Sequence, residues 1–142
     1  MRKKNILVKI IVADYYKKVS DSLLSSAISV LEDNKIDYKV INVPGVYEIP
    51  QMIKWQIKSN KINLFIALGC VLKGDTYHFE VISDSVSKSL LDLVNNNSNT
   101  IISNGIINAY NMKQALNRSK MNEKNKGLEA SSAMLRMVKC LI

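Results

Sequence analysis

The sequence runs Leu64-Phe65-Ile66-Ala67-Leu68-Gly69-Cys70-Val71-Leu72 without a charged residue and, after Lys73, continues as Gly74-Asp75-Thr76-Tyr77-His78. The apolar run has the length of a strand buried on both faces, and a segment of helical period follows the glycine turn. This order predicts a loop at the carboxyl edge of a sheet, where open α/β folds bind ligands. Amide groups and the Thr76 hydroxyl can hold an anion there, with His78, the only histidine, one turn into the helix as a proton carrier.

Apolar runs of strand length alternate along the chain with segments of helical period. The expected strands are Ile6 to Ala13, Tyr38 to Val43, Leu64 to Cys70 and Thr100 to Ile107. This alternation is typical of a parallel sheet that is covered by helices. We therefore expect an α/β fold, a flavodoxin-like three-layer αβα sandwich with a four-stranded parallel sheet, formed by a single domain over residues 1–142.

Five segments have the apolar spacing or the length expected of helices. They are Val19, Leu23, Ala27, Val30 and Leu31; Met52, Ile53 and Ile57; Phe79, Ile82, Val86, Leu90 and Leu93; Met112 to Asn117; and Leu128 to Val138. Asn34 and the polar run 95–99 are expected to end the first and third helices, and Pro50 fits only a first helical turn.

Composition excludes several classes of protein. The formal net charge is +8 at pH 7, but the lysines are scattered and do not interleave with aromatic residues, so we expect no nucleic-acid partner. Cys70 and Cys140 match no disulfide or metal-ligand spacing, which suits a reducing cytosol and predicts no metal. Lys9 divides the first apolar stretch, which is therefore a strand rather than a signal peptide. No apolar window approaches the roughly 18 residues of a membrane span, and we expect a cytoplasmic protein.

Four stretches should meet at the carboxyl edge of this sheet: residues 13–16, 44–50, 69–78 and 104–118. Taken singly, Tyr15, Glu48 and Arg118 have ordinary structural explanations as a core-edge ring, a helix N-terminal charge and a surface cation. Their coincidence at one edge favours a binding pocket.

Four motifs in these stretches and just beyond them resemble the lumazine synthase family of riboflavin biosynthesis. They are Pro44-Gly45-Val46-Tyr47-Glu48-Ile49-Pro50, Leu68 to Phe79, Gly105 to Arg118, and Asn125-Lys126-Gly127-Leu128-Glu129-Ala130. The resemblance implies condensation of 5-amino-6-ribitylaminouracil with 3,4-dihydroxy-2-butanone 4-phosphate to 6,7-dimethyl-8-ribityllumazine, phosphate and water, with no cofactor. Each step of this reaction moves protons. His78 is the only side chain of the chain with an ordinary pKa of about 6.5, so it is the expected catalyst.

The resemblance implies binding positions for the pyrimidine and its ribityl chain. These are Tyr15, Val46, Tyr47, Glu48, Cys70, Val71 and Leu72. Tyr15 matches an aromatic that stacks on the ring, and the Glu48 carboxylate would accept hydrogen bonds from ribityl hydroxyls. The segment that begins at Cys70 would recognise the heterocycle through main-chain groups, so the Cys70 thiol need not react.

The resemblance also implies a phosphate site. Asp75 and Thr76 match the phosphate-binding turn, and Arg118 matches an arginine whose planar fork can hold two phosphate oxygens. We expect Asp75 to contact phosphate through its backbone N–H, with its carboxylate turned away or capping the helix. Lys126 is expected to stabilise substrate charge, and Glu129 to support the site.

Some positions depart from the family pattern. Asn104 stands where many relatives carry a phenylalanine that closes over the ring from the neighbouring subunit, so it is expected to line the pocket without stacking. Ala13 and Asp14 replace a glycine and often an arginine. Relatives form homopentamers with shared sites, so we expect the first-strand edge and the region from Asn104 to Arg118 to meet an adjacent subunit.

Two other readings of the sequence stay open at this point. One is a non-catalytic module that binds a flavin or a lumazine in the same pocket, since one fold hosts many functions. The other is a flavodoxin-like or response-regulator domain. The first strand has no acidic cluster for Mg²⁺, however, and no hydroxyl-rich phosphate loop follows it.

Overall fold

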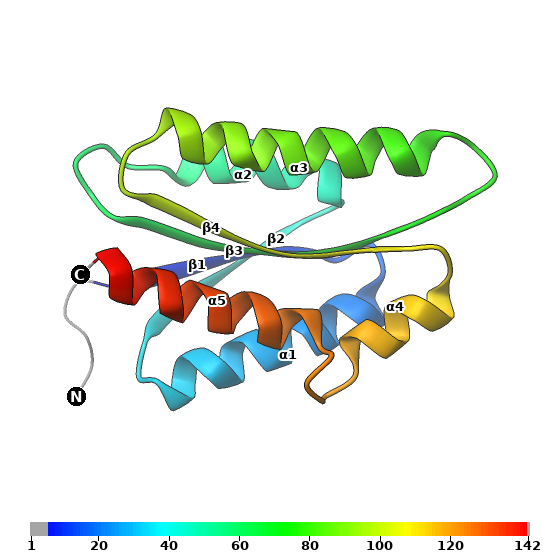
Figure 1. Cartoon of the computed structure of the whole chain (residues 1–142), viewed down its shortest axis with the longest axis horizontal. Helices are drawn as coiled ribbons and strands as arrows, with labels where there is room; N and C mark the ends of the chain where they lie inside the picture. The colour runs from blue at the N-terminus through cyan, green and yellow to red at the C-terminus, as the bar shows by residue number, and fades with distance from the viewer. Residues whose placement is uncertain (1–5, 142) are drawn as a thin grey trace.

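The structure, a computed structural model that describes residues 6–141, contains one four-stranded parallel sheet. Its strands are β1 (Leu7–Ala13), β2 (Asp37–Val43), β3 (Asn63–Leu72) and β4 (Thr100–Ala109), in the order β2-β1-β3-β4. The helices are α1 (Lys17–Asp33), α2 (Ile49–Gln56), α3 (His78–Asn96), α4 (Met112–Ser119) and α5 (Lys126–Leu141), with a 3₁₀ turn η1 (Val46–Glu48) before α2. Helices α2 and α3 cover one face of the sheet and α1, α4 and α5 the other (Figure 1). The predicted three-layer α/β sandwich is confirmed.

Strand β3 forms the centre of the core. It pairs with β1 on one side and β4 on the other, and every residue from Asn63 to Val71 is buried. Ile66 and Leu68 face the cluster under α1 and α5, whereas Phe65 and Ala67 face the cluster under α2 and α3. Burying each large side chain contributes roughly 1.5–3 kcal/mol, so β3 ties both helical layers to one sheet.

The sheet differs from prediction mainly at strand ends. β3 and β4 continue to Leu72 and Ala109, which remain in register with each other, and β1 begins at Leu7 rather than Ile6. Ile57 lies outside α2, because its backbone is extended (φ −69°, ψ 130°). The polar run ends α3 as predicted: the Asn97 side chain donates to the Leu93 carbonyl at 2.7 Å.

Strand β1 has no free edge. It is hydrogen-bonded to β2 and to β3 along its length, so the expectation that its edge meets another subunit is wrong. The free edges belong to β2 and β4. The N-terminal arm, residues 1–5, lies outside the described residues. Within residues 6–141 no helix is long and apolar enough to cross a membrane.

Helix α5 begins where a buried asparagine and a glycine meet α1. Asn125 Oδ1 accepts from the Gly127 and Leu128 N–H groups at 2.8 and 3.0 Å, while Asn125 Nδ2 donates to the Ser119 carbonyl at 2.9 Å. A Cβ atom at Gly127 would lie 2.2 Å from the Leu23 carbonyl oxygen, which is backbone and cannot move aside freely. Only glycine allows the first turn of α5 to approach α1 this closely.

This contact predicts that Gly127→Ala will lower the free energy of unfolding by about 3 kcal/mol, the upper end of the usual cost of overpacking. Gly74→Ala is the matched control, because a Cβ there would meet nothing within 4 Å, and its effect should stay within about 1 kcal/mol. Urea unfolding at one fixed protein concentration measures both. Equal effects would show that α5 can shift to relieve the contact.

Candidate functional site

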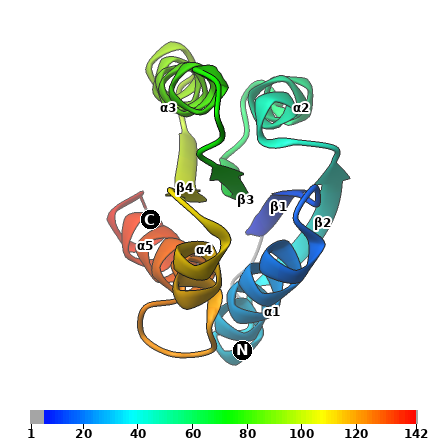
Figure 2. The same ribbon diagram turned by 90° about the vertical axis from the view of Figure 1, so that its right-hand side faces the viewer.

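A cavity of about 580 Å³ opens at the carboxyl edge of the sheet, and we call it the His78 cavity. Four elements meet there: the loop after β1, the turn η1, the end of β3 and the start of α3 (Figure 2). Its lining residues are Tyr15, Tyr16, Gly45, Val46, Tyr47, Glu48, Cys70, Val71, Leu72, His78, Val81 and Ile82. β1 and β3 are neighbours from which the chain continues to opposite sides, the usual place for a ligand in such sheets.

A close approach at Gly69 builds the inner end of the cavity. A Cβ atom at Gly69 would lie 2.8 Å from Val46 Cγ2 and 3.1 Å from Ala13 Cβ. The turn η1 therefore packs directly on the ends of β1 and β3. This contact leaves Tyr47 exposed and Glu48 half-buried beside the opening.

Two tyrosines form one wall. The Tyr15 and Tyr16 rings meet edge to face, with centroids 4.9 Å apart and an interplanar angle of 82°. Tyr16 is anchored against the core, and burial raises the pKa of its hydroxyl, followed by the influence of Tyr15 and Cys70. Tyr15 is 75% exposed, so its ring is open to a flat ligand.

His78 is the first residue of α3 rather than one turn into it. Its backbone N–H donates to Thr76 Oγ1 at 3.4 Å, while among the described residues no hydrogen bond engages its imidazole. The adjacent Phe79 ring packs on Tyr110 with centroids 6.3 Å apart, and the Lys73 ammonium lies 5.4 Å from the centre of the same Tyr110 ring. The imidazole is thus exposed to solvent while the backbone that carries it is braced against the end of β4.

Cys70 lies deeper in the same wall and is 6% exposed. Burial raises the pKa of its thiol to about 11. The thiol is therefore neutral at physiological pH and is a poor nucleophile, because reactivity belongs to the thiolate. Cys70 contributes shape and main chain to the cavity.

A second concave surface, the Arg118 groove, has a volume of about 930 Å³ and runs along the end of β4 between α4 and α5. Its charged lining residues are Arg118, Lys120, Glu123, Lys124 and Lys126, so cations exceed carboxylates by four to one. Glu129 forms an ion pair with Lys126 at 3.1 Å and holds that ammonium at the rim. The groove suits an anionic group.

The predicted site residues divide between these two surfaces. Tyr15, Val46, Tyr47, Glu48, Cys70, Val71, Leu72 and His78 line the His78 cavity. Asp75 and Thr76 lie in the exposed loop before α3, outside that lining. Arg118 and Lys126 line the groove, which shares no residue with the cavity, so within one chain the end of the fourth stretch lies apart from the other three.

Asn104 lines neither surface of its own chain, and its expected place in the pocket of a neighbouring subunit stays a prediction. It is exposed on β4, an edge strand, and its Oδ1 accepts from the Ile106 N–H at 2.9 Å. Its side chain is therefore solvent-exposed and lies outside the cavity of its own chain.

Sequence reasoning missed Tyr16, Val81 and Ile82 as lining residues. Val81 and Ile82 stand three and four residues after His78 and so share its face of α3, a signal that helical periodicity contains. The capping role of Asn125 was also missed, although asparagine three residues before an apolar position is a common helix start. Within residues 6–141 no three His, Cys, Asp or Glu side chains converge as metal ligands.

Comparison of the sequence with known proteins matches the chain to one family. A family model described as 6,7-dimethyl-8-ribityllumazine synthase matches residues 5–141. A protein of that name from Bartonella bacilliformis is 42% identical over 131 residues, covering 91% of this chain and 86% of its own. The Bartonella henselae protein is 41% identical (95% and 88% covered), and that of Agrobacterium fabrum is 37% identical (97% and 95% covered). The chain belongs to the 6,7-dimethyl-8-ribityllumazine synthase family.

Proposed function

We propose that this enzyme is a transferase, a 6,7-dimethyl-8-ribityllumazine synthase. It condenses 5-amino-6-ribitylaminouracil with 3,4-dihydroxy-2-butanone 4-phosphate and releases phosphate and water. The observation that carries this proposal is the His78 cavity itself, which in a member of this family is lined by both the only imidazole of the chain and the exposed ring of Tyr15. The volume lies within the range of small-molecule sites.

The pyrimidine occupies the His78 cavity. Its ring stacks on the exposed face of Tyr15, and its ribityl hydroxyls donate to the Glu48 carboxylate. Val46 and Tyr47 enclose the chain from η1. The main chain from Cys70 to Leu72 supplies N–H and C=O groups to the edge of the heterocycle, because the carboxyl end of β3 extends beyond its pairing with β1.

His78 carries protons between the reacting atoms. The substrate amine attacks the ketone, and loss of water gives an imine. Phosphate then leaves, and the second nitrogen closes the ring with loss of another water. A group that takes up and releases protons near neutral pH serves each step. The exposed imidazole at the start of α3 can reach the bound substrates without breaking an existing hydrogen bond among the described residues.

The phosphate is held by a second copy of the chain. Arg118 and Lys126 are separated from the His78 cavity of their own chain, and Asn104 faces outward on the β4 edge. These facts support a ring, a homopentamer, in which the Arg118 groove and Asn104 of one copy border the His78 cavity of the next. Asp75 and Thr76 offer backbone and hydroxyl groups to the same phosphate, and Glu129 orients Lys126. Asn104 adds a polar contact rather than a stacked ring.

We also infer that residues 1–142 act as one domain in the cytoplasm, with small-molecule substrates and neither a nucleic-acid nor a membrane partner. The support is that both apolar clusters are built on the same sheet, and that the lysines are scattered along the sequence.

His78→Ala should lower turnover by roughly 10²–10⁴-fold, the usual contribution of a general acid–base group. The measurement is phosphate release with both substrates present, with pyrimidine affinity determined separately by fluorescence. Lys88→Gln, an exposed change on the same helix, is the control and should retain full turnover. A His78→Ala enzyme within threefold of the parent would exclude His78 from the mechanism.

Mixing two inactive variants tests the shared site. Subunits carrying His78→Ala and subunits carrying Arg118→Gln, co-refolded in equal amounts, should regain about one quarter of the parental activity, because about one interface in four pairs an intact His78 with an intact Arg118. Each variant refolded alone is the control and should stay inactive. No recovery in assemblies shown by native mass spectrometry to be mixed would mean that one chain supplies both residues.

The pKa of Cys70 predicts both slow alkylation and a loss of stability at high pH. Iodoacetamide at pH 8 should modify the exposed Cys140 first and leave turnover unchanged. Because burial raises the folded-state pKa of this thiol from its ordinary value of 9.0 to about 11, the stabilisation is complete below pH 9 and is lost as pH rises toward 11. Unfolding across that range should show the decline, and Cys70→Ala should show less of it. Rapid loss of turnover with modified Cys70 would contradict the backbone role.

A further inference from the structure

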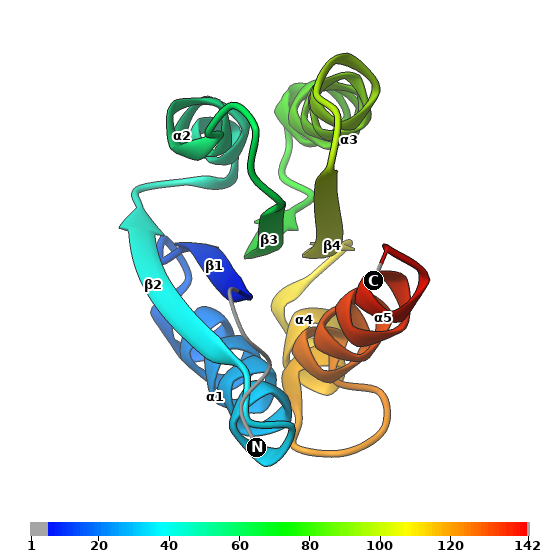
Figure 3. The same ribbon diagram turned by 90° about the vertical axis from the view of Figure 1, so that its left-hand side faces the viewer.

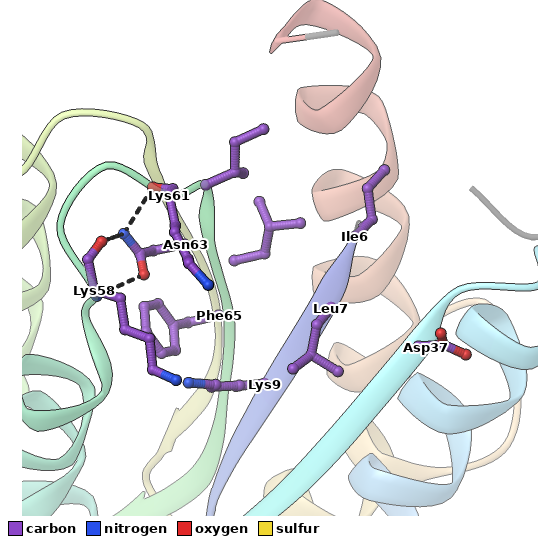
Figure 4. A pocket seen from close by; sticks show the side chains of 10 residues that line it. Ile6, Leu7, Lys9, Asp37, Lys58, Lys61, Asn63 and Phe65 are labelled. Atoms are coloured by element: carbon purple, nitrogen blue, oxygen red, sulfur yellow. Dashed lines mark hydrogen bonds between the residues drawn. The ribbon is translucent and has the colours of Figure 1, made fainter. Parts of the chain in front are cut away.

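A third cavity, which we call the amino-edge pocket, lies at the opposite end of the sheet. It has a volume of about 790 Å³ and is formed by the first residues of β1, β2 and β3 together with the α2–β3 loop (Figures 3 and 4). The seven residues of β1, at about 3.3 Å each, place it roughly 20 Å from the His78 cavity. The proposed reaction does not use it.

Three lysines face this pocket. Lys9 comes from β1, and Lys58 and Lys61 come from the α2–β3 loop. The Lys9 and Lys58 side chains point toward each other (Figure 4), and no ion pair joins any of the three lysines to a carboxylate among residues 6–141. Asp37 is the one acidic lining residue. The described lining thus carries an excess of two positive charges.

Lys9 is held in place. Its Nζ donates to the Gln56 side-chain oxygen at 3.0 Å and to the Gln56 carbonyl at 3.4 Å, which leaves donor capacity for a ligand. Its pKa is lowered, first by burial and then by the nearby charges of Lys58 and Lys39. An anion that enters the pocket would relieve this repulsion between cations.

The loop that carries the other two lysines is fixed by a buried side chain. Asn63, which is 7% exposed, accepts from the Lys58 N–H at 2.9 Å and donates to the Lys58 and Lys61 carbonyls at 3.0 and 3.1 Å. Asn60 between them takes a left-handed backbone (φ 61°) that completes the turn. The two lysine backbones are therefore positioned before any ligand arrives, which reduces the entropy cost of binding.

The remainder of the lining is apolar. Ile6, Leu7, Ile62, Leu64 and Phe65 form it, and Leu7 and Ile62 are each 43% exposed. An inorganic anion would leave these apolar side chains exposed to water. A ligand with an apolar or aromatic body attached to its anionic group would cover it.

We propose that the amino-edge pocket binds a phosphate monoester with an apolar or aromatic body, with Lys58 and Lys61 at the phosphate and the Lys9 amine beside the body. A phosphate monoester carries about −1.5 to −2 charges at pH 7, which matches the excess positive charge better than a single carboxylate does. The site is separate from the proposed active site.

Pyridoxal 5′-phosphate is the probe, because it joins an aromatic ring, a phosphate and an aldehyde that forms an imine with a nearby lysine amine. The full-length protein is treated briefly at pH 8, reduced with borohydride and mapped by mass spectrometry. Lys9 should be labelled at least about tenfold faster than the exposed control Lys88, and phenyl phosphate, which has no aldehyde, should protect it.

Three variants separate the outcomes. Lys58→Gln/Lys61→Gln should slow labelling of Lys9 at least about tenfold while thermal unfolding stays unchanged, since both side chains are exposed. Lys88→Gln/Lys113→Gln is the matched charge control and should have no effect. Arg118→Gln should leave Lys9 labelling intact even though it disables the proposed active site. Labelling of Lys9 no faster than Lys88, or indifferent to phenyl phosphate and to the loop lysines, would overturn the proposal.

Discussion

Burial of β3 on both faces is the constraint on which the rest of the structure depends. Because β3 pairs with β1 and β4 and carries side chains into both apolar clusters, the two helical layers are fixed relative to each other. The same strand places Gly69 where η1 must pack and continues to Leu72 beside His78. A strand that serves the core therefore also sets the depth and width of the cavity.

The two surfaces at the carboxyl edge differ in chemistry as the two substrates do. The His78 cavity combines aromatic rings, apolar side chains and main chain, which suit a flat, uncharged heterocycle. The Arg118 groove gathers cations near the end of α4 and the start of α5, which suit a phosphate. Because one chain separates these properties, the proposed site joins two copies, and in that proposal the assembly is part of the catalytic apparatus.

Local patterns predicted most of the fold, and long-range geometry accounts for what they missed. The apolar runs located all four strands, but register with a partner, not composition, carries β3 and β4 on to Leu72 and Ala109. Residues at strand ends were placed correctly around the His78 cavity. Arg118 lies in a separate groove of its own chain, since helical period in α4 and α5 does not reveal on which side of β4 the chain turns. Whether the predicted residues bind substrate stays a prediction.

Because Val8 of β1 pairs with Leu64 of β3, the sheet cannot be completed during translation until β3 has been synthesised. A nascent chain that has completed β2 at Val43 can form half of the sheet, yet one side of β1 stays unpaired until residues 44–62 have been added and β3 follows. Unpaired edges of this kind invite association between growing chains. Lys9 places a charge in the unpaired strand β1, and this charge disfavours association with other chains until β3 has been synthesised.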